Sequence, residues 1–145
     1  MQKMTIADIH DLLSGHIHTA KLATVRADGR PHVASIWYAI DGAGEQFQLV
    51  FTSWHETVKV ANLRRDPRVC LIVDDETPPF AFVQIEGTAA ISDDMAALKQ
   101  WATVIGGKYM GADKAEAFGT RNAVPGELLI RVTPTKIIGT KDMAG

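Results

Sequence analysis

Short apolar runs separated by turn residues restrict the fold of this chain more than any other feature. The runs are AKLATV, PHVASIWYAI, FQLVFT, VCLIVDD, FAFVQIEGTAAI and ELLIRVTPTKIIG. An Asp28-Gly29 turn joins the first two, which is a typical hairpin signal. Six short strands joined mostly by tight turns favour an antiparallel barrel over an open sheet, because closure removes exposed strand edges. Strands and helices do not alternate along the chain, which argues against a doubly wound parallel fold.

Helical spacing of apolar residues appears in only a few segments. TIADIHDLLSG predicts a first helix that is capped by Thr5 and ends near Gly15. A second short helix is expected from about His55 to Arg65. Ser92 is expected to cap a third helix, SDDMAALKQWATVIGGKYM, and ADKAEAFG to form a short fourth one. The predicted fold class is therefore mainly β, with a few helices.

Length and charge limit the classes of function. The chain has 145 residues, which predicts one domain over residues 1–145. Its formal net charge is -2, so neither nucleic acid nor an anionic membrane is an expected partner. No window approaches the roughly 20 apolar residues of a membrane helix. The single Cys70 rules out an internal disulfide and suits a reducing compartment, so we expect a cytoplasmic protein.

The segment LVFTSWHETVKVANLRRDP changes from a strand to a helix near its centre. A helix N-terminus carries unpaired N–H groups and partial positive charge, which together favour a phosphate. Ser53 precedes the turn, Thr57 lies near the first helical turn, and Lys59 can reach the same anion by curling around the helix end. The alternative is that Ser53 only caps the helix and Lys59 is solvated. No Walker-type glycine loop decides between them.

Three stretches of the chain resemble a known family. They are ATVRADGRPHVASIWYAID, LVFTSWHETVKVANLRRDPRVCLIVDD and FVQIEGTAAI, in that order. They are similar to the pyridoxamine 5'-phosphate oxidase-like, FMN-binding split barrels, and within these to the branch of coenzyme F420-dependent reductases. The resemblance runs from about residue 5 to residue 140, and its most specific part is the T-x-K-x-x-N-L-R-R-D-P run from Thr57 to Pro67.

The resemblance implies a six-stranded split barrel that forms a homodimer, with the cofactor in a groove between the subunits. The strand-helix junction would hold the cofactor phosphate through Ser53, Thr57 and Lys59, and Thr52 at the same junction would be a further cofactor contact. Other cofactor contacts would come from the strand beside the ring, from the helix end and from the second subunit: His32, Val33, Ala34, Ser35, Arg64 and Gln84. For Ser35 and Gln84, ordinary strand polarity is an equal alternative.

The implied activity is hydride transfer between the deazaflavin coenzyme F420 and an electron-poor small molecule, such as an enone, quinone or tetrapyrrole. FMN is the alternative cofactor, and a non-catalytic cofactor carrier is the alternative function. A cofactor of this kind carries the redox chemistry itself, so no catalytic side chain is assigned. His16 and His18 lack a third ligand at a recognisable spacing, so no metal site is expected. The chain also lacks the C-terminal Arg, Trp and His residues of the true oxidases, so oxidation of vitamin B6 is not expected.

Overall fold

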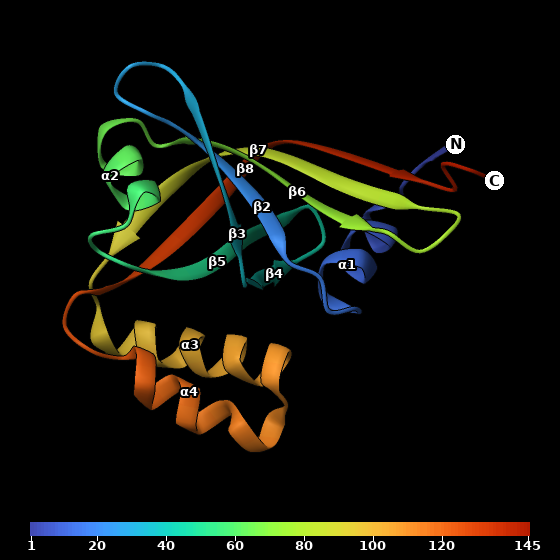
Figure 1. The fold of residues 1–145 in the computed structure, drawn as a ribbon. Helices are drawn as coiled ribbons and strands as arrows, with labels where there is room; N and C mark the ends of the chain where they lie inside the picture. Colours follow the sequence, from blue (N-terminus) through green and yellow to red (C-terminus); the bar gives the residue numbers. More distant parts are fainter.

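The strands form one antiparallel sheet in the order β3-β2-β6-β7-β8-β5-β4, with β1 paired to β8 (Figure 1). The computed structural model describes residues 1–145. The strands are β1 (Gln2–Lys3), β2 (Ala20–Val25), β3 (Pro31–Ile36), β4 (Ala39–Ala43), β5 (Gln46–Trp54), β6 (Arg68–Asp75), β7 (Ala81–Ser92) and β8 (Glu127–Lys141). The edge strands β3 and β4 do not pair with each other, so the bent sheet is a split barrel, as predicted.

The sheet contains eight strands where six were expected, and two local features account for the difference. The run PHVASIWYAI breaks into β3 and β4 at Trp37, whose ring stacks on Tyr109. The backbone N–H of Tyr38 then donates a hydrogen bond to the Tyr109 hydroxyl (3.3 Å) and not to a carbonyl of a neighbouring strand. The short β1 is the second addition, because it pairs with the end of β8.

The helices are α1 (Ile6–Ser14), α2 (Val58–Arg65), α3 (Met95–Met110) and α4 (Ala115–Asn122), with a 3₁₀ turn at Ala112–Lys114. Figure 1 shows α3 and α4 side by side as a hairpin along one side of the sheet. Helices α1 and α2 lie at opposite ends of the sheet in the same view. None of the helices has both the length and the apolar content needed to span a lipid bilayer.

Side-chain caps set the helix boundaries. Thr5 caps α1 in a reciprocal pair with Asp8, as its position predicts. Helix α3 is capped by Asp94 and not by Ser92, so the expectation for Ser92 was wrong. The Ser92 hydroxyl instead accepts a hydrogen bond from the Asp94 N–H (3.1 Å) and orders the residue before the helix. Helix α2 begins at Val58, three residues later than expected, because the Thr57 side chain caps it.

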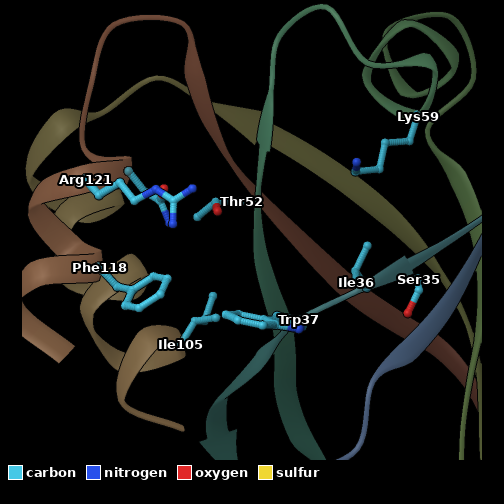
Figure 2. Close-up of a pocket in the computed structure, with 9 residues that line it drawn as sticks. Ser35, Ile36, Trp37, Thr52, Lys59, Ile105, Phe118 and Arg121 are labelled. Carbon is cyan, nitrogen blue, oxygen red and sulfur yellow. The ribbon is translucent and has the colours of Figure 1, made fainter. Parts of the chain in front are cut away.

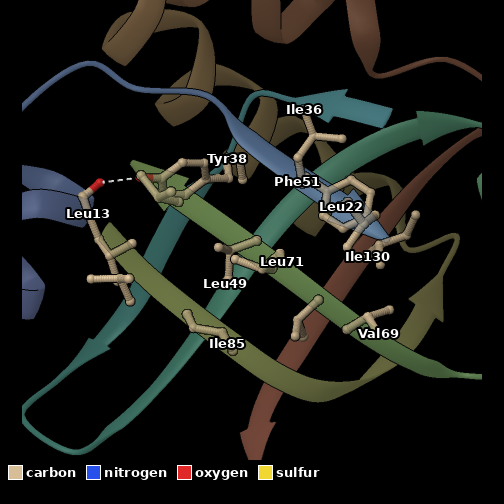
Figure 3. Close-up of a cluster of buried hydrophobic side chains, with 14 of the residues drawn as sticks. Leu13, Leu22, Ile36, Tyr38, Leu49, Phe51, Val69, Leu71, Ile85 and Ile130 are labelled. Atoms are coloured by element: carbon tan, nitrogen blue, oxygen red, sulfur yellow. Dashed lines mark hydrogen bonds between the residues drawn. The ribbon is translucent and has the colours of Figure 1, made fainter. Parts of the chain in front are cut away.

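Two apolar clusters hold the molecule together. The larger has 21 buried residues and fills the concave side of the sheet (Figure 3). At its edge the buried Tyr38 hydroxyl donates to the Leu13 carbonyl (2.8 Å), which joins α1 to the barrel. The smaller cluster packs α3 against the outside of β4, β5 and β8 through residues such as Val50 and Trp101. Strand β5 is therefore buried on both faces, which explains its consecutive apolar residues.

Candidate functional site

A pocket of about 360 Å³ lies between the barrel and the α3–α4 hairpin (Figure 2). Its lining comes from β3, β5, α2, α3 and α4 and from the residue after β3: Ser35, Ile36, Trp37, Thr52, Lys59, Ile105, Phe118, Arg121 and Asn122. Three of the residues predicted from the sequence, Ser35, Thr52 and Lys59, are thus brought together. Most of the lining side chains are polar or charged, and the apolar ones are Ile36, Trp37, Ile105 and Phe118.

Strand alternation separates the two hydroxyls at the end of β5. Side chains on a strand point alternately to its two faces. Thr52 shares a face with Val50, toward α3, and lines the pocket. Ser53 shares the opposite face with Phe51 and is 3% exposed. Of the two neighbouring candidates, only Thr52 therefore reaches the pocket in this chain.

Ser53 and Thr57 form a hydroxyl pair inside the junction. Their Oγ and Oγ1 atoms are 2.9 Å apart. Thr57 Oγ1 also donates to the Trp54 carbonyl (3.1 Å) and accepts from the Val60 N–H (3.4 Å), which caps α2. These two predicted phosphate ligands thus have partners within the chain, and neither lines the pocket. Their hydrogen bonds instead connect the end of β5 to the first turn of α2.

Lys59 supplies positive charge on the barrel side of the pocket. Burial lowers the pKa of its ammonium group, and the nearby Glu127 carboxylate partly offsets this effect. Burial also raises the pKa of the Glu127 carboxyl group, and this effect is larger than the lowering by a hydrogen bond with Thr52 and by the positive charge of Lys59. Lys59, Thr52 and Glu127 therefore form one electrostatic group. Glu127 is far from Lys59 in the sequence, and the pairing of β5 with β8, which places Glu127 opposite Trp54, brings it near the pocket. Sequence reasoning therefore missed it.

Helix α2 is fastened to β2 by side chains of the NLRR run. The buried Asn62 amide donates to the Thr24 hydroxyl (2.9 Å). The Arg65 guanidinium donates to the Val25 carbonyl and to Asn62 Oδ1. These bonds anchor to the sheet the helix that carries Lys59.

The predicted ring-side strand is an edge of the sheet. Strand β3 pairs only with β2, so its other edge has free backbone N–H and C=O groups. Val33 and Ser35 lie on one face of it, and Val33 is 64% exposed. His32 and Ala34 lie on the other face with the buried Ile36. The Nδ1 atom of His32 is buried and has no hydrogen-bond partner within the chain.

Two predicted cofactor residues lie outside this pocket. Arg64 is exposed on α2 and is not part of the lining. Gln84 lies on the outer face of the sheet, where its Nε2 is 3.6 Å from Cys70 Sγ. One chain alone does not bring either side chain to the pocket, and the sequence prediction had assigned Gln84 to the second subunit.

The α3–α4 hairpin adds an aromatic and cationic wall. The rings of Trp37 and Tyr109 are stacked, with centroids 4.8 Å apart and planes 8° apart. Phe118 lies 6.2 Å from Trp37, and the Arg121 guanidinium lies 5.6 Å from the Phe118 ring. Sequence reasoning missed both Phe118 and Arg121. Nothing in their local pattern distinguishes them from an ordinary amphipathic helix.

The comparison with protein families decides what kind of fold holds this pocket. The family model described as "Pyridoxamine 5'-phosphate oxidase" matches residues 7–141. The chain belongs to the pyridoxamine 5'-phosphate oxidase family. The assignment confirms the resemblance seen in the sequence. It applies to the barrel, the junction and the hairpin together, because the match covers all of them.

Solved structures of related proteins show the same fold. A conserved hypothetical protein from Mycobacterium tuberculosis has a TM-score of 0.83 at 26% identity, over 97% of this chain and 87% of its own. An F420 reductase has a TM-score of 0.62 at 26% identity, over 88% and 94%. A FAD-binding protein from Mesorhizobium loti has a TM-score of 0.69 at 18% identity, over 95% and 93%. This family member therefore has a fold found in proteins that use flavins or deazaflavins.

Proposed function

We propose that this protein is an oxidoreductase that uses coenzyme F420 to transfer a hydride to an electron-poor small molecule. The observation that carries the proposal is the convergence of Ser35, Thr52 and Lys59 on one pocket that has an aromatic wall. These side chains come from three separate elements, and the family match covers all three. FMN is the second candidate cofactor, because a flavin would use the same phosphate and ring contacts.

The residues present suit a phosphorylated planar cofactor. Lys59 and Thr52 offer a cation and a hydroxyl, which are the groups that bind a phosphate. The free edge of β3 offers backbone donors and acceptors for a ring with polar edges. The Nδ1 atom of His32, on the same strand, is buried and has no hydrogen-bond partner within the chain.

The bound cofactor would supply the hydride chemistry, and the chain would bind and orient it. Lys59 and Thr52 would fix the phosphate end, while β3 would align the ring. Trp37 and Ile105 would exclude water from one side of the pocket, where a substrate could lie. The chain has no assigned proton donor in this scheme, and solvent water would protonate the product.

Titration with each cofactor tests this proposal. The purified protein is mixed with coenzyme F420 and with FMN, and binding is followed by absorbance and fluorescence. The reduced complex is then given quinone and enone acceptors, and oxidation of the cofactor is recorded. We expect tighter binding of F420 and oxidation that depends on the protein. Tighter binding of FMN would favour the second candidate, and binding without any turnover would indicate a cofactor carrier.

We also propose that the protein works as a homodimer with its cofactor at the subunit interface. The outer face of the sheet carries apolar cross-strand neighbours that the chain itself leaves partly uncovered: Ala23, Val33, Cys70, Ile72 and Ile138. Gln84 lies on the same face. A second copy packed there would cover the apolar side chains and would bring Gln84 toward the cofactor of its partner.

A further inference from the structure

The hairpin side of the pocket carries aromatic rings and a second cation, which binding of a cofactor phosphate does not require. We define the hairpin wall as Trp37, Ile105, Phe118 and Arg121. The stack of Trp37 on Tyr109 fixes the Trp37 ring, and the Tyr109 hydroxyl is itself held by the His18 carbonyl (2.7 Å). The three apolar members of the wall therefore form a preformed surface against which a planar molecule could pack.

Arg121 places an unused cation beside this surface. Its guanidinium lies over Phe118 but forms no ion pair with any carboxylate of the chain. The nearby acidic group, Glu127, is instead coupled to Lys59 and Thr52. An arginine has a rigid fork of N–H groups that matches a carboxylate. An apolar plane next to a free guanidinium is thus suited to a planar ligand with a carboxylate.

The pocket contains two separate positions for negative charge. Figure 2 shows Lys59 on the barrel side and Arg121 on the hairpin side, with Trp37 and Thr52 between them. One phosphate at Lys59 leaves Arg121 without a partner. We infer that Arg121 is a specificity-determining residue that holds the carboxylate of a planar, electron-poor substrate. This inference rests on the proposed function, because it names the substrate class of that same site.

Calorimetry with a matched pair of probes tests the inference. Anthraquinone carboxylate and its neutral carboxamide are titrated into the protein loaded with FMN, which has a phosphate but no carboxylate. The wild type should bind the carboxylate about tenfold more tightly than the carboxamide, as expected for one charge-assisted contact. Arg121→Gln should remove this preference, and Arg121→Lys should restore part of it. The control Lys114→Gln removes a charge from the same hairpin outside the pocket and should leave the preference intact.

Other outcomes would overturn the inference in distinguishable ways. Equal weakening of both probes by Arg121→Gln would show that Arg121 supports the wall without recognising the carboxylate. Displacement of FMN by the probe would place Arg121 in the site of the cofactor. A loss of F420 binding but not of FMN binding in Arg121→Gln would assign the guanidinium to the acidic tail of that cofactor. If neither cofactor bound while the Arg121-dependent preference persisted, the carboxylate subsite would stand, and its assignment to a redox substrate would fail with the proposed function.

Discussion

At the scale of single residues, Lys59 and Glu127 show how the pocket balances its charge. Burial disfavours the charged form of each, and each charge stabilises the other. A phosphate that entered the pocket would meet a lysine whose charge is already partly balanced by the nearby Glu127 carboxylate. Under the proposed function we expect the affinity for the phosphate to depend on both residues, although only the lysine could be proposed from the sequence.

Replacement of Lys59 by alanine should weaken binding of phosphorylated cofactors selectively. A hydrogen bond to a charged group contributes about 1.5–3 kcal/mol, which corresponds to roughly 10- to 100-fold in affinity. Lys59→Ala should raise the dissociation constants of FMN and F420 by that order, as measured by fluorescence titration. Riboflavin, which has no phosphate, should bind almost as it does to the wild type. Equal losses for FMN and riboflavin would show that Lys59 does not recognise the phosphate.

The companion variant Glu127→Gln should have the opposite effect. It removes the negative charge beside Lys59 and keeps a side chain of similar size. FMN should then bind several-fold more tightly, because less repulsion opposes the phosphate. Unchanged FMN affinity would mean that Glu127 is too well screened by solvent to matter.

Lys108 provides a test of pH dependence away from the pocket lining. It donates to the carbonyls of Leu13 (3.0 Å) and Tyr38 (3.2 Å), and burial lowers its pKa from 10.5 to about 8. Between pH 8 and 10.5 the unfolded chain then holds a proton at Lys108 that the folded chain has released. The stability of the wild type relative to Lys108→Met should therefore rise with pH across this range. Urea unfolding at about pH 7.5, 9 and 10 gives the free energy of unfolding of both proteins. A difference between the two free energies that stays constant with pH would contradict the expected titration of Lys108.

At the scale of elements, the strand-helix junction was predictable because its signals are local. The apolar run, the hydroxyls and the Asp66-Pro67 stop all lie within one stretch of sequence. The same alternation that buries Val50 and Phe51 on opposite faces could have separated Thr52 from Ser53. The wall of the pocket was not predictable, because Phe118 and Arg121 reach it only through the packing of α3 against β5. The break between β3 and β4 had the same cause, since Tyr109 lies on α3.

Loss of the α2 cap should destabilise the protein without any cofactor. Thr57→Val keeps the shape of the side chain but cannot accept from the Val60 N–H or pair with Ser53. The free energy of unfolding should fall by about 1 kcal/mol, the usual effect of a lost N-cap. Thr120→Val, at an exposed position of α4, is the matched control and should have little effect. Urea titrations measure both changes. An equal loss of unfolding free energy in the two variants would contradict a specific stabilising role of the Thr57 cap.

At the scale of the whole molecule, the partly covered outer face of the sheet determines what assembly is expected. Ile72 lies at the centre of this face, opposite Gln84 on the neighbouring strand. Large apolar areas left uncovered on a small protein often mark an interface. Strand β3 contributes Val33 to this face and Ser35 to the pocket, so we expect an interface here to affect cofactor binding as well.

Ile72→Glu should convert the expected dimer to a monomer. A buried carboxylate without a partner costs several kcal/mol, so association should be lost at micromolar concentration. Sedimentation velocity should show a dimer for the wild type and a monomer for the variant. Ile17→Glu is the matched control, because Ile17 is 65% exposed outside this face and its change should leave the dimer intact. A wild-type monomer that binds cofactor at full affinity would contradict the assembly.

The position of the α3–α4 hairpin in the chain suggests how the lining of the pocket could be changed without changing the sheet. It occupies the connection between β7 and β8, two strands that pair directly from Phe82 with Thr140 to Ser92 with Leu129. The length of such a connection can change with little loss of stability, because each doubling of a flexible loop adds only about 0.6 kcal/mol to the entropic cost of closing it. None of the pairs between β7 and β8 involves residues 93–126. Grafting a different segment onto the same two strands would therefore replace Phe118 and Arg121 in the pocket lining while keeping Thr52 and Lys59, which lie outside the hairpin.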